Sequence, residues 1–452
     1  MEKRRVRKKI QLVNSPLSQD FTESSKAGSY PPLNLLTLAT YLQQRLPGID
    51  IEILDGEIIS LKKILLEVEA DIVGISSGIL SYETAVQIAN VASKRGSKVI
   101  MGGAYPTSMA KLILSNRRSV DAVVLNDGEE SLLLYLLDKD IDKIPNLAYR
   151  KDGNIFFNKE IVNPINAVSI TNYELINLSK YFNNFQKNYP TKPFNGAFSI
   201  FSSKGCLWRD ISGGCIYCAL QTYGYRTKSP ETIWHEIKEL HNKYNIDFFW
   251  DVSDTFTRPL NRLKDIAKNK PNNLDVSLLL YGRSDDINDY VAKLLSYIGT
   301  HEVFIGVESG DNNILYTANR GQNSSDALTA VQTLAKYGIK TIVSFQFGLP
   351  GESEESCKSS LKLAKKLGET GTVTEVFSSV LLPMPGSMTF RMLMQNKKVQ
   401  KKYRGKDIFS IEKLRKDFIN QFCNVSYDYI KQVRDKIMDF FPMASSLGKE
   451  KE

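Results

Sequence analysis

The sequence has few features that would direct a protein into a membrane or out of the cell. No run of about 18 or more apolar residues occurs among the 452 positions, which excludes an ordinary membrane-spanning helix. Six of the first nine residues are Lys or Arg, but no apolar stretch follows them, so we expect no secretory signal. We therefore expect a cytoplasmic protein.

The chain also lacks the two commonest nucleotide-binding fingerprints. No G-x-G-x-x-G follows the first predicted strand, which disfavours a dinucleotide site. No G-x-x-x-x-G-K-[ST] occurs, which disfavours a P-loop nucleotide site. Hydrophobic residues make up 42% and charged residues 24% of the chain, so most of it can form folded domains rather than disordered segments.

Positive charge exceeds negative charge by nine and is concentrated in two places. One is the basic start, and the other is 396–406, where six of the eleven residues are Lys or Arg. Such runs indicate either an anionic partner, nucleic acid or membrane, or simply a solvated surface. The runs contain almost no interleaved aromatic residues, which favours the solvated surface and gives no firm nucleic-acid or membrane signal.

The first third of the chain alternates short apolar runs with amphipathic segments, a pattern that predicts βαβ units and a parallel sheet. The predicted strands are Lys9–Asn14, Ile51–Leu54, Asp71–Ser76, Lys98–Met101 and Ala122–Leu125. Ligands of an open parallel sheet bind beyond the carboxyl ends of its strands, so the Gly- and Ser-rich loops there form a candidate site. Alternatively, their glycines only make tight turns. We predict a Rossmann-like α/β domain over residues 8–143.

The rest of the chain divides into three predicted parts. Residues 144–195 are polar and weakly periodic, apart from a hairpin with an Asp-Gly turn near 152–153, and are predicted to connect two domains. Six further strand and helix patterns over 196–389 predict a parallel sheet curled as a partial (β/α)6 barrel. Residues 390–452 form a basic, helix-rich C-terminal region without a strand signal.

Three of the five cysteines fall within thirteen residues, directly after the first strand of the second domain. Cys206, Cys215 and Cys218 lie in a glycine-containing loop, where thiolates hold zinc or an iron–sulfur cluster. Zinc would need a fourth ligand, and the candidate His235 lies inside the following predicted helix. Cys357 and Cys423 are isolated, and we predict that they only pack.

The cysteine loop and the ends of the later strands resemble those of the radical S-adenosylmethionine (SAM) enzymes. The matching segments are Trp250–Phe256, Tyr281–Asp285, Ile305–Gly310, Phe347–Glu352 and Leu382–Ser387, in order along the chain. The pair Cys215-Ile216-Tyr217-Cys218 keeps the family spacing. Eight residues instead of the usual three separate Cys206 from Cys215, and we expect the additional residues to bulge outward.

This resemblance implies that Cys206, Cys215 and Cys218 bind a [4Fe–4S] cluster whose open iron chelates SAM. Reductive cleavage of SAM then yields a 5′-deoxyadenosyl radical, with an electron donor such as flavodoxin or ferredoxin as a partner. The candidate SAM-binding residues that the resemblance implies are Tyr217, Ser253, Asp254, Arg283, Glu308 and Ser344. Arg226 is a weaker candidate, and for both arginines an ordinary ion pair is the alternative.

The first domain resembles the cobalamin-binding domain that precedes the barrel in one large radical SAM subgroup. The supporting segments are Pro31–Leu36, Asp71–Ser77, Met101–Gly103 and Asn126–Glu130. The resemblance implies cobalamin contacts from Ser76, Ser77, Gly102, Gly103, Pro106, Thr107, Asn126 and Gly128. The Asp-x-His-x-x-Gly motif that supplies a cobalt ligand elsewhere is absent, as it is in many members of the subgroup. The alternative is a domain that docks a partner without a cofactor.

Three functions follow, in order of preference. The first is cobalamin-dependent C-methylation of an unactivated carbon in a small-molecule or lipid-like substrate, which makes the protein a methyltransferase. The second is radical SAM cyclisation, oxidation or C–C coupling without methyl transfer. The third is a zinc-stabilised binding module that docks an anionic partner through its basic tail. The sequence identifies no catalytic acid or base and no specific substrate.

Overall fold

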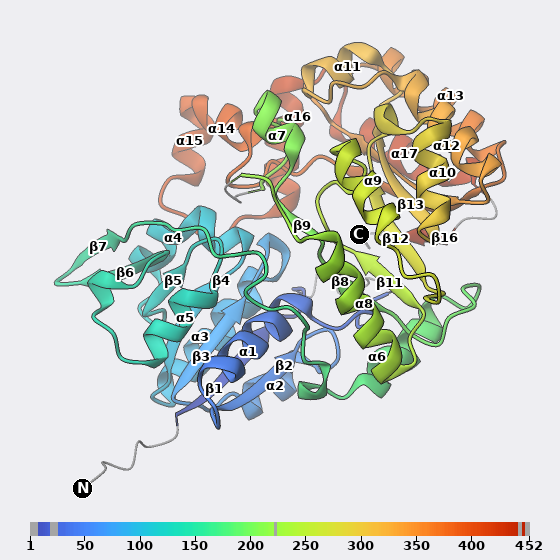
Figure 1. Ribbon diagram of the computed structural model, residues 1–452. Helices are drawn as coiled ribbons and strands as arrows, with labels where there is room; N and C mark the ends of the chain where they lie inside the picture. The colour runs from blue at the N-terminus through green and yellow to red at the C-terminus, as the bar shows by residue number, and fades with distance from the viewer. Residues whose placement is uncertain (1–7, 19–25, 221–223, 442–444, 448–452) are drawn as a thin grey trace, which may run out of the picture.

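The computed structural model describes residues 8–18, 26–220, 224–441 and 445–447. Most of the basic start, residues 1–7, therefore lies outside the described part of the chain. Two sheets of seven strands each form the two lobes, and helices cover both sheets (Figure 1). The α/β class predicted from the sequence is confirmed. No helix in the described residues is both long and apolar enough to span a membrane.

The first sheet has the strand order β2-β1-β3-β4-β5-β6-β7. Its strands are β1 (Lys9–Asn14), β2 (Asp50–Asp55), β3 (Ile72–Ser76), β4 (Lys98–Gly102), β5 (Ala122–Val124), β6 (Leu147–Lys151) and β7 (Asn154–Phe157). The first five are parallel, because a helix crosses over after each of β1 to β4. These helices, with α5 after β5, are α1 (Leu33–Arg45), α2 (Leu61–Glu67), α3 (Tyr82–Lys94), α4 (Ala104–Asn116) and α5 (Glu129–Leu136).

Both faces of this sheet are covered, which explains its continuous apolar strands. Helices α1 and α5 pack on one face, and α2, α3 and α4 pack on the other. The predicted hairpin is present as β6 and β7, and it adds two antiparallel strands to β5. The first sheet thus continues to Phe157, past the domain boundary predicted at residue 143. The prediction stopped short because no pattern in the sequence shows that the hairpin pairs with β5.

The second sheet has the order β16-β15-β14-β13-β12-β11-β8 and is parallel throughout. Its strands are β8 (Phe198–Ile200), β11 (Phe248–Asp251), β12 (Ser277–Gly282), β13 (Thr300–Glu308), β14 (Lys340–Phe347), β15 (Val373–Val380) and β16 (Ser445–Leu447). The helices between them are α8 (Pro230–Tyr244), α9 (Leu260–Lys268), α10 (Asp289–Tyr297), α11 (Asn312–Thr317), α12 (Ser324–Lys336) and α13 (Glu354–Gly368). Six of its strands are those predicted for the partial barrel.

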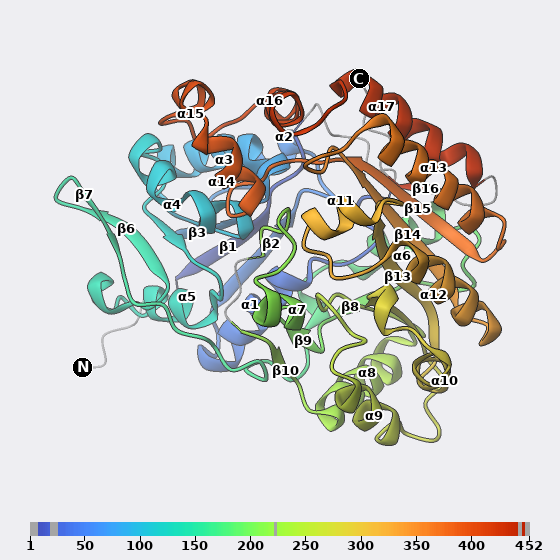
Figure 2. The ribbon, with the colours of Figure 1, turned by 90° about the horizontal axis from the view of Figure 1, so that it is seen from above.

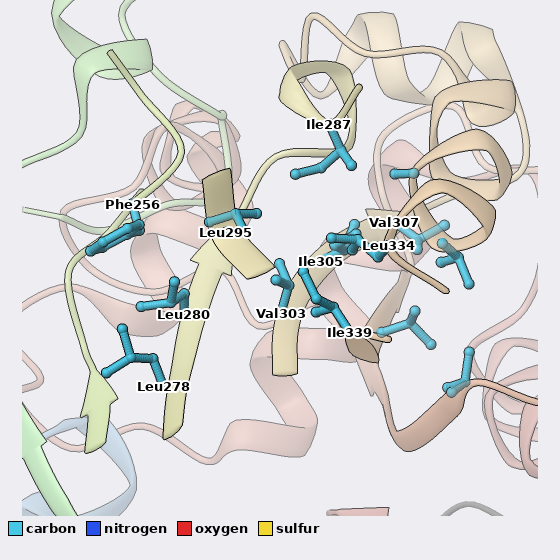
Figure 3. Packing of buried hydrophobic residues seen from close by; sticks show 14 of the residues in the cluster. Phe256, Leu278, Leu280, Ile287, Leu295, Val303, Ile305, Val307, Leu334 and Ile339 are labelled. Atoms are coloured by element: carbon cyan, nitrogen blue, oxygen red, sulfur yellow. The ribbon is translucent and has the colours of Figure 1, made fainter. Parts of the chain in front are cut away.

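The core of the second lobe lies between this sheet and its outer helices (Figure 3). On β13, Val303, Ile305 and Val307 point into that core, where they meet Leu295 of α10 and Leu334 of α12. Successive strand residues point to opposite faces, so Phe304, Gly306 and Glu308 face the interior of the curled sheet. The alternation therefore fixes which side chains can line a site.

The C-terminal region joins the two lobes. It contains α14 (Met388–Gln395), α15 (Lys397–Tyr403), α16 (Ile411–Phe422) and α17 (Tyr427–Lys436), and α14 and α15 lie beside the first lobe in both views (Figures 1 and 2). One expectation was wrong: residues 445–447 form β16, which pairs with β15. Three residues at a sheet edge are too short to give a recognisable strand pattern. The segment before the barrel, predicted as a weakly periodic connection between domains, also contains α6 (Leu178–Asn188).

Candidate functional site

The cysteine loop leaves the carboxyl end of β8 and is closed at its base by a two-residue ladder. There β9 (Ser203–Lys204) pairs with β10 (Arg226–Thr227). Residues 207–212 between the first two cysteines form a short helix, α7 (Leu207–Ser212). Gly213 and Gly214 follow with φ angles of 84° and 82°, which side chains with a Cβ rarely adopt. The additional residues thus form a helix that ends in a glycine turn and returns the chain to Cys215.

Helix α7 is fastened to the loop that follows β13 and α11. Trp208 Nε1 donates to the carbonyl of Asn319 at 2.8 Å. Asn319 Nδ2 donates in turn to the carbonyls of Ser212 and Gly214, at 3.0 and 2.8 Å. A Cβ atom at Gly321 would lie 2.2 Å from the Trp208 ring, so glycine is needed there. These contacts give the long cysteine loop a fixed shape.

The three cysteine side chains are half-buried and have different surroundings. Cys206 Sγ lies 3.7 Å from Thr255 Oγ1, and Cys215 Sγ accepts from Arg320 Nη1 at 3.6 Å. Burial raises the pKa of the Cys218 thiol, although the Arg209 guanidinium acts in the opposite direction. In the described part of the chain, no three His, Cys, Asp or Glu residues converge as around one metal ion. In a four-iron cluster each thiolate instead binds a different iron, and three thiolates with a neighbouring cation fit that donor set.

Glu308 and Tyr217, two predicted SAM-binding residues, come together around Arg320. Glu308 ends β13 with a φ of 63°, and its Oε1 lies 3.8 Å from Arg320 Nη2. Arg320 Nη2 also donates to the carbonyl of Gly306 at 2.7 Å. Burial raises the pKa of Glu308, and the Arg320 charge opposes that shift. The Tyr217 hydroxyl is buried in the same cluster, where its interaction with Glu308 also acts to lower the pKa of that carboxyl.

Ser253 and Arg283 do not have side chains free for SAM. Ser253 Oγ accepts from the amides of Ser202 and Ser203, at 3.0 and 2.8 Å, and donates to Asp251. Arg283 donates to Asp285 and to the carbonyl of Arg320, at 3.0 and 2.5 Å.

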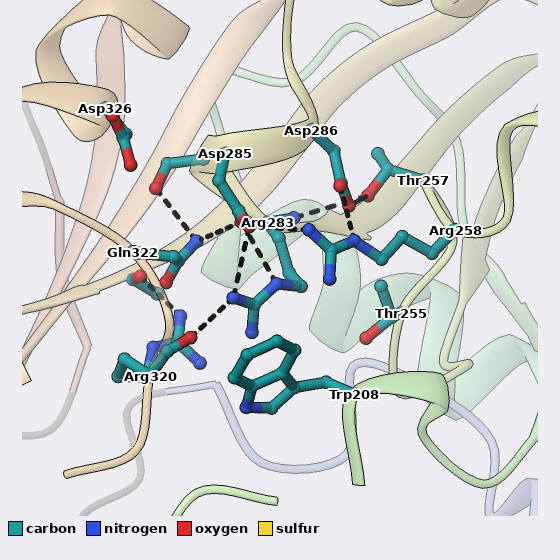
Figure 4. Close-up of polar contacts among 12 residues, drawn as sticks. Trp208, Thr255, Thr257, Arg258, Arg283, Asp285, Asp286, Arg320, Gln322 and Asp326 are labelled. Carbon is teal, nitrogen blue, oxygen red and sulfur yellow. Dashed lines mark hydrogen bonds and ion pairs between the residues drawn. The ribbon is translucent and has the colours of Figure 1, made fainter. Parts of the chain in front are cut away.

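The guanidinium of Arg283 also lies over the Trp208 ring, 4.6 Å from its centre (Figure 4). Arg258 lies beside the same ring and pairs with Asp285 and Asp286. The ion-pair alternative thus describes Arg283 better, because the guanidinium holds α7 in place instead of facing an open site.

The other two SAM-binding candidates lie in different places. Ser344 is half-buried on β14, opposite Gly306 in the strand register, and faces the curled interior. Asp254 follows β11 and faces a cavity between the two lobes. The walls of that cavity raise the pKa of Asp254 by limiting its access to solvent. Hence Ser344 lies near Glu308, whereas Asp254 belongs to the inter-lobe cavity.

This cavity has a volume of about 470 Å³ and lies where the carboxyl ends of both sheets meet. The first lobe contributes most of its lining, including six of the eight predicted cobalamin-binding residues: Ser76, Gly102, Gly103, Thr107, Asn126 and Gly128. The second lobe contributes Phe201 and Ser203–Gly205, which lead directly into Cys206, and Ala219 and Leu220, which follow Cys218. The cavity therefore adjoins the cysteine loop.

Ser77 and Pro106 are the two predicted contacts that do not line the cavity. Ser77 is buried beneath Gly103, where an added Cβ atom would lie 2.6 Å from the Ser77 carbonyl oxygen. Pro106 is buried in the first turn of α4. Both residues support the loops from the side away from the cavity. Their positions in the loops did not predict this, because loop position does not give side-chain direction.

The cavity fits a large ligand with apolar walls and a few polar contacts. Its lining residues include Thr37, Asn126 and Ser203, each of which has a buried side-chain oxygen without a hydrogen-bond partner in the described residues. Buried polar atoms are almost always hydrogen-bonded in native proteins, so these three atoms indicate a missing polar partner. The corrin of cobalamin combines a broad apolar ring with many amide groups, so the apolar walls and polar groups of this cavity fit cobalamin.

Ion pairs hold the cysteine-loop ladder against the first lobe beside the cavity. Lys204 Nζ lies 3.1 Å from Asp127 and 3.3 Å from Glu129. Arg226 Nη1 lies 2.8 Å from the other oxygen of Asp127, so the ion-pair alternative describes Arg226 as well. These charges lower the pKa of Asp127 in spite of its burial. The two lobes are thereby joined at the edge of the cavity.

Several site residues were missed from the sequence. Arg320 and Trp208 belong to no motif, and only folding places them beside Cys215 and Arg283. Asn34 lines the cavity and donates to Ser76 Oγ at 3.0 Å. The Pro31–Leu36 segment that supported the cobalamin-domain resemblance contains Asn34. The sequence therefore held this signal, although Asn34 was not named as a candidate contact.

Two family models match the chain at the positions of these features. Residues 200–364 match the radical SAM superfamily, and residues 24–135 match the B12 binding domain. The chain thus contains a radical SAM domain preceded by a B12-binding domain, the combination that the sequence resemblance predicted.

This radical SAM protein has relatives among named methyltransferases. An uncharacterized methyltransferase of Pyrococcus horikoshii is 27% identical over 383 residues, which cover 81% of this chain and 79% of the relative. The bacteriochlorophyllide d C-12(1)-methyltransferase of Chlorobaculum tepidum is 26% identical, over 85% of this chain and 78% of that protein.

A solved structure shares the architecture. The radical SAM methyltransferase TsrM of Kitasatospora setae, determined with cobalamin and a [4Fe–4S] cluster bound, superposes with a TM-score of 0.67. The match covers 86% of this chain and 78% of TsrM, at 18% sequence identity. At that identity the likeness shows a common fold, which confirms the predicted order of a B12-type sheet followed by a partial barrel.

Proposed function

We propose that this radical SAM enzyme is a cobalamin-dependent methyltransferase that methylates an unactivated carbon. The observation that carries the proposal is the shared wall between the two sites. The cavity formed by the B12-type loops is completed by residues 203–205, which end at the first cysteine, and by Ala219 and Leu220, which follow the last. Both cofactors would therefore act on one substrate between the lobes.

Cys206, Cys215 and Cys218 would hold the [4Fe–4S] cluster, and the six lining residues of the B12-type loops would hold cobalamin. When bound, the cluster and SAM supply a 5′-deoxyadenosyl radical that removes a hydrogen atom, and cobalamin supplies the methyl group. We assign Glu308, Tyr217 and Ser344 to SAM binding because they face the curled interior. Asp254 would contact SAM or substrate from the cavity side.

The protein's own residues prepare the site in two ways. Arg320 places a buried positive charge beside Cys215 and donates a hydrogen bond to its Sγ atom at 3.6 Å. Apolar side chains, including Leu12, Leu38 and Met101, line the cavity and exclude water from reactive intermediates. Ser253 and Arg283 would act as positioning residues, Ser253 under the start of the cysteine loop and Arg283 against α7.

The remaining parts of the proposal are coarser. The substrate would be a small molecule or lipid-like compound, the electron donor a flavodoxin or ferredoxin, and the location the cytoplasm. We further propose that residues 196–389 act as the catalytic lobe and that the first lobe, extended to Phe157, acts as the cobalamin lobe. The region from 390 onward would hold the two lobes together.

The proposal is tested by anaerobic reconstitution with iron, sulfide and hydroxocobalamin, followed by iron and cobalt analysis. We expect about four irons and about one cobalt per chain, with iron lost and cobalt retained in Cys215→Ala. The matched control Cys423→Ser should keep both metals, because Cys423 Sγ only donates to the Leu349 carbonyl at 3.3 Å.

The metal content and the products together separate the candidate functions. Four irons without cobalt would contradict the methyltransferase and leave the radical chemistry, and a zinc-loaded protein without iron would support the binding module. With a substrate present, S-adenosylhomocysteine indicates methyl transfer, whereas 5′-deoxyadenosine alone indicates cyclisation, oxidation or coupling.

A further inference from the structure

The C-terminal region presents a strongly basic surface that the proposed chemistry does not use. This surface, here called the basic α15 face, consists of Lys397, Lys398, Lys401, Lys402, Arg404 and Lys406, all exposed. Residues 396–406 contain no Asp or Glu. Lys402 pairs with Asp417 at 2.5 Å, and the other five have no carboxylate partner in the described residues. Most of this charge is therefore available to a partner.

The side of α15 opposite this face packs in an apolar cluster that extends to the cysteine loop. Val399 and Tyr403 belong to the same apolar cluster as Tyr217, which lies between the second and third cysteines. Helix α14 adds a backbone contact, since the Thr389 amide donates to the carbonyl of Ile216 at 3.0 Å. Met388, next to Thr389, is 44% exposed. A short, packed path thus connects the exposed face with Cys215 and Cys218.

The far end of the basic α15 face is anchored on the first lobe. Asn116 Nδ2 of α4 donates to the Gly405 carbonyl at 2.8 Å. Asp407, which is buried, accepts from Arg117 Nε at 2.6 Å and from the Tyr82 hydroxyl at 2.8 Å. These contacts fix the position of the basic α15 face on the first lobe, and α15 lies beside α4 in both views (Figures 1 and 2).

We propose that the basic α15 face is the docking surface for an acidic one-electron carrier protein of the flavodoxin or ferredoxin type. This inference rests on the proposed function, which needs one electron for each SAM cleaved. The docked carrier is oxidised by one electron, and the cysteine-loop site is reduced by that electron. Exposed positive charges attract and orient an acidic partner without binding it too tightly to leave.

Nucleic acid and membrane fit this surface less well. Single-stranded nucleic acid is held by aromatic side chains between basic residues, but Tyr403 is only 6% exposed and its hydroxyl donates to Asp417. A membrane-surface helix needs a free apolar side, whereas Val399 and Tyr403 of α15 are packed in the protein. Charge complementarity close to the cysteine loop therefore favours the carrier protein.

The test compares a triple variant, Lys397→Glu/Lys398→Glu/Lys401→Glu, with a matched control, Lys238→Glu/Lys362→Glu/Lys366→Glu, on α8 and α13. The control residues are exposed and have no ion-pair partner in the described residues. SAM cleavage is measured on reconstituted enzyme with reduced flavodoxin and, separately, with titanium(III) citrate. We expect the first variant to raise the KM for flavodoxin at least about ten-fold at low salt, with the titanium-driven rate unchanged.

The same measurement defines the contrary results. At high ionic strength the wild type should approach the variant, since screening removes the attraction. An equal rise in KM for the control variant, or no rise in the first, would overturn the docking surface. The docking surface would also be overturned if the first variant lost binding to an RNA oligonucleotide or an anionic vesicle but kept its flavodoxin-driven turnover. If the wild type cleaves no SAM even with titanium(III) citrate, the proposed function itself is wrong.

Discussion

The carboxyl ends of the two sheets are built for different tasks. At the first sheet, small residues such as Gly102 and Gly103 leave an open cavity with unpartnered polar atoms. At the second sheet, many charged side chains already pair with one another, as Arg258 and Arg283 do with Asp285 (Figure 4). The first edge is open to receive a ligand, whereas the second uses its charges to hold a loop.

This difference follows from what each site must control. A large, largely apolar cofactor is bound by area and a few hydrogen bonds, so its site needs space more than charge. A cluster held by three residues of one loop depends on the shape of that loop. Paired charges supply rigidity, because each is fixed by more than one partner. The comparison predicts that mutations at the first edge change cofactor affinity, whereas mutations of buried charged groups elsewhere change stability.

Filling the first edge should have the largest effect. In Gly102→Leu a side chain enters the cavity, and the Cβ atom itself is tolerated because its nearest neighbour, the Val124 carbonyl oxygen, is 3.9 Å away. We expect cobalamin affinity to fall about 100-fold, or about 2.7 kcal/mol, with iron content unchanged. Spectroscopic titration with hydroxocobalamin measures this effect. Gly78→Ala, with nothing within 4 Å of its Cβ, is the control and should bind normally.

Breaking the contact between the C-terminal region and the first lobe should have a smaller effect, on stability. Burial opposes the charge of Asp407, but hydrogen bonds from Arg117 and Asn116 outweigh it, and its pKa lies below the usual value. Asp407→Asn should lower the free energy of unfolding by about 2 kcal/mol at neutral pH.

A pH series sharpens this prediction. Because the folded pKa of Asp407 is lowered, its stabilisation is present at neutral pH and is lost as pH falls through that pKa. Chemical denaturation at several pH values should therefore show the wild type approaching the variant in acid. The exposed pair of Asp142 with Lys151 gives the control, since Asp142→Asn should leave stability unchanged. An equal loss in both variants would contradict the assigned role.

The smallest effect should come from a buried carboxyl at the second edge. Burial raises the pKa of Glu352 to about 7, although the amides of Gly348 and Leu349 donate to it. The folded protein then holds a proton that the unfolded chain releases, so this group lowers stability as pH rises between about 4.5 and 7. Glu352→Gln removes that dependence and keeps an acceptor for the two amides.

Melting curves at pH 6 and pH 8 measure this effect. Relative to the wild type, Glu352→Gln should become more stable by about 1 kcal/mol between the two values. Glu355→Gln on the exposed start of α13 is the control and should show no such trend. An equal difference in stability between wild type and Glu352→Gln at both values would contradict the raised pKa of Glu352.

Much of this protein was predictable because its signals are local. The alternation of strands and helices, the cysteine spacing and the strand-end motifs all lie within short stretches of sequence. The Ser229-Pro230 start of α8 is an example of such a local signal, since Ser229 accepts from the amide of Thr232 and so caps the helix. The hairpin near Asp152 was found in the same way, but its pairing with β5 was not.

By itself, the sequence determined the order of the two α/β units through its regular βα repeats, and its resemblance to the radical SAM enzymes predicted the class of chemistry. Only the tertiary structure decided which polar and charged side chains already have partners within the protein. The sequence offered Arg283 and Ser253 as SAM contacts, yet in the fold both side chains bind other groups of the protein. The fold also brings Arg320 to Cys215, which the sequence did not indicate. The reason is that a side chain's partners come from strands and loops far along the chain, and no local pattern encodes those distances.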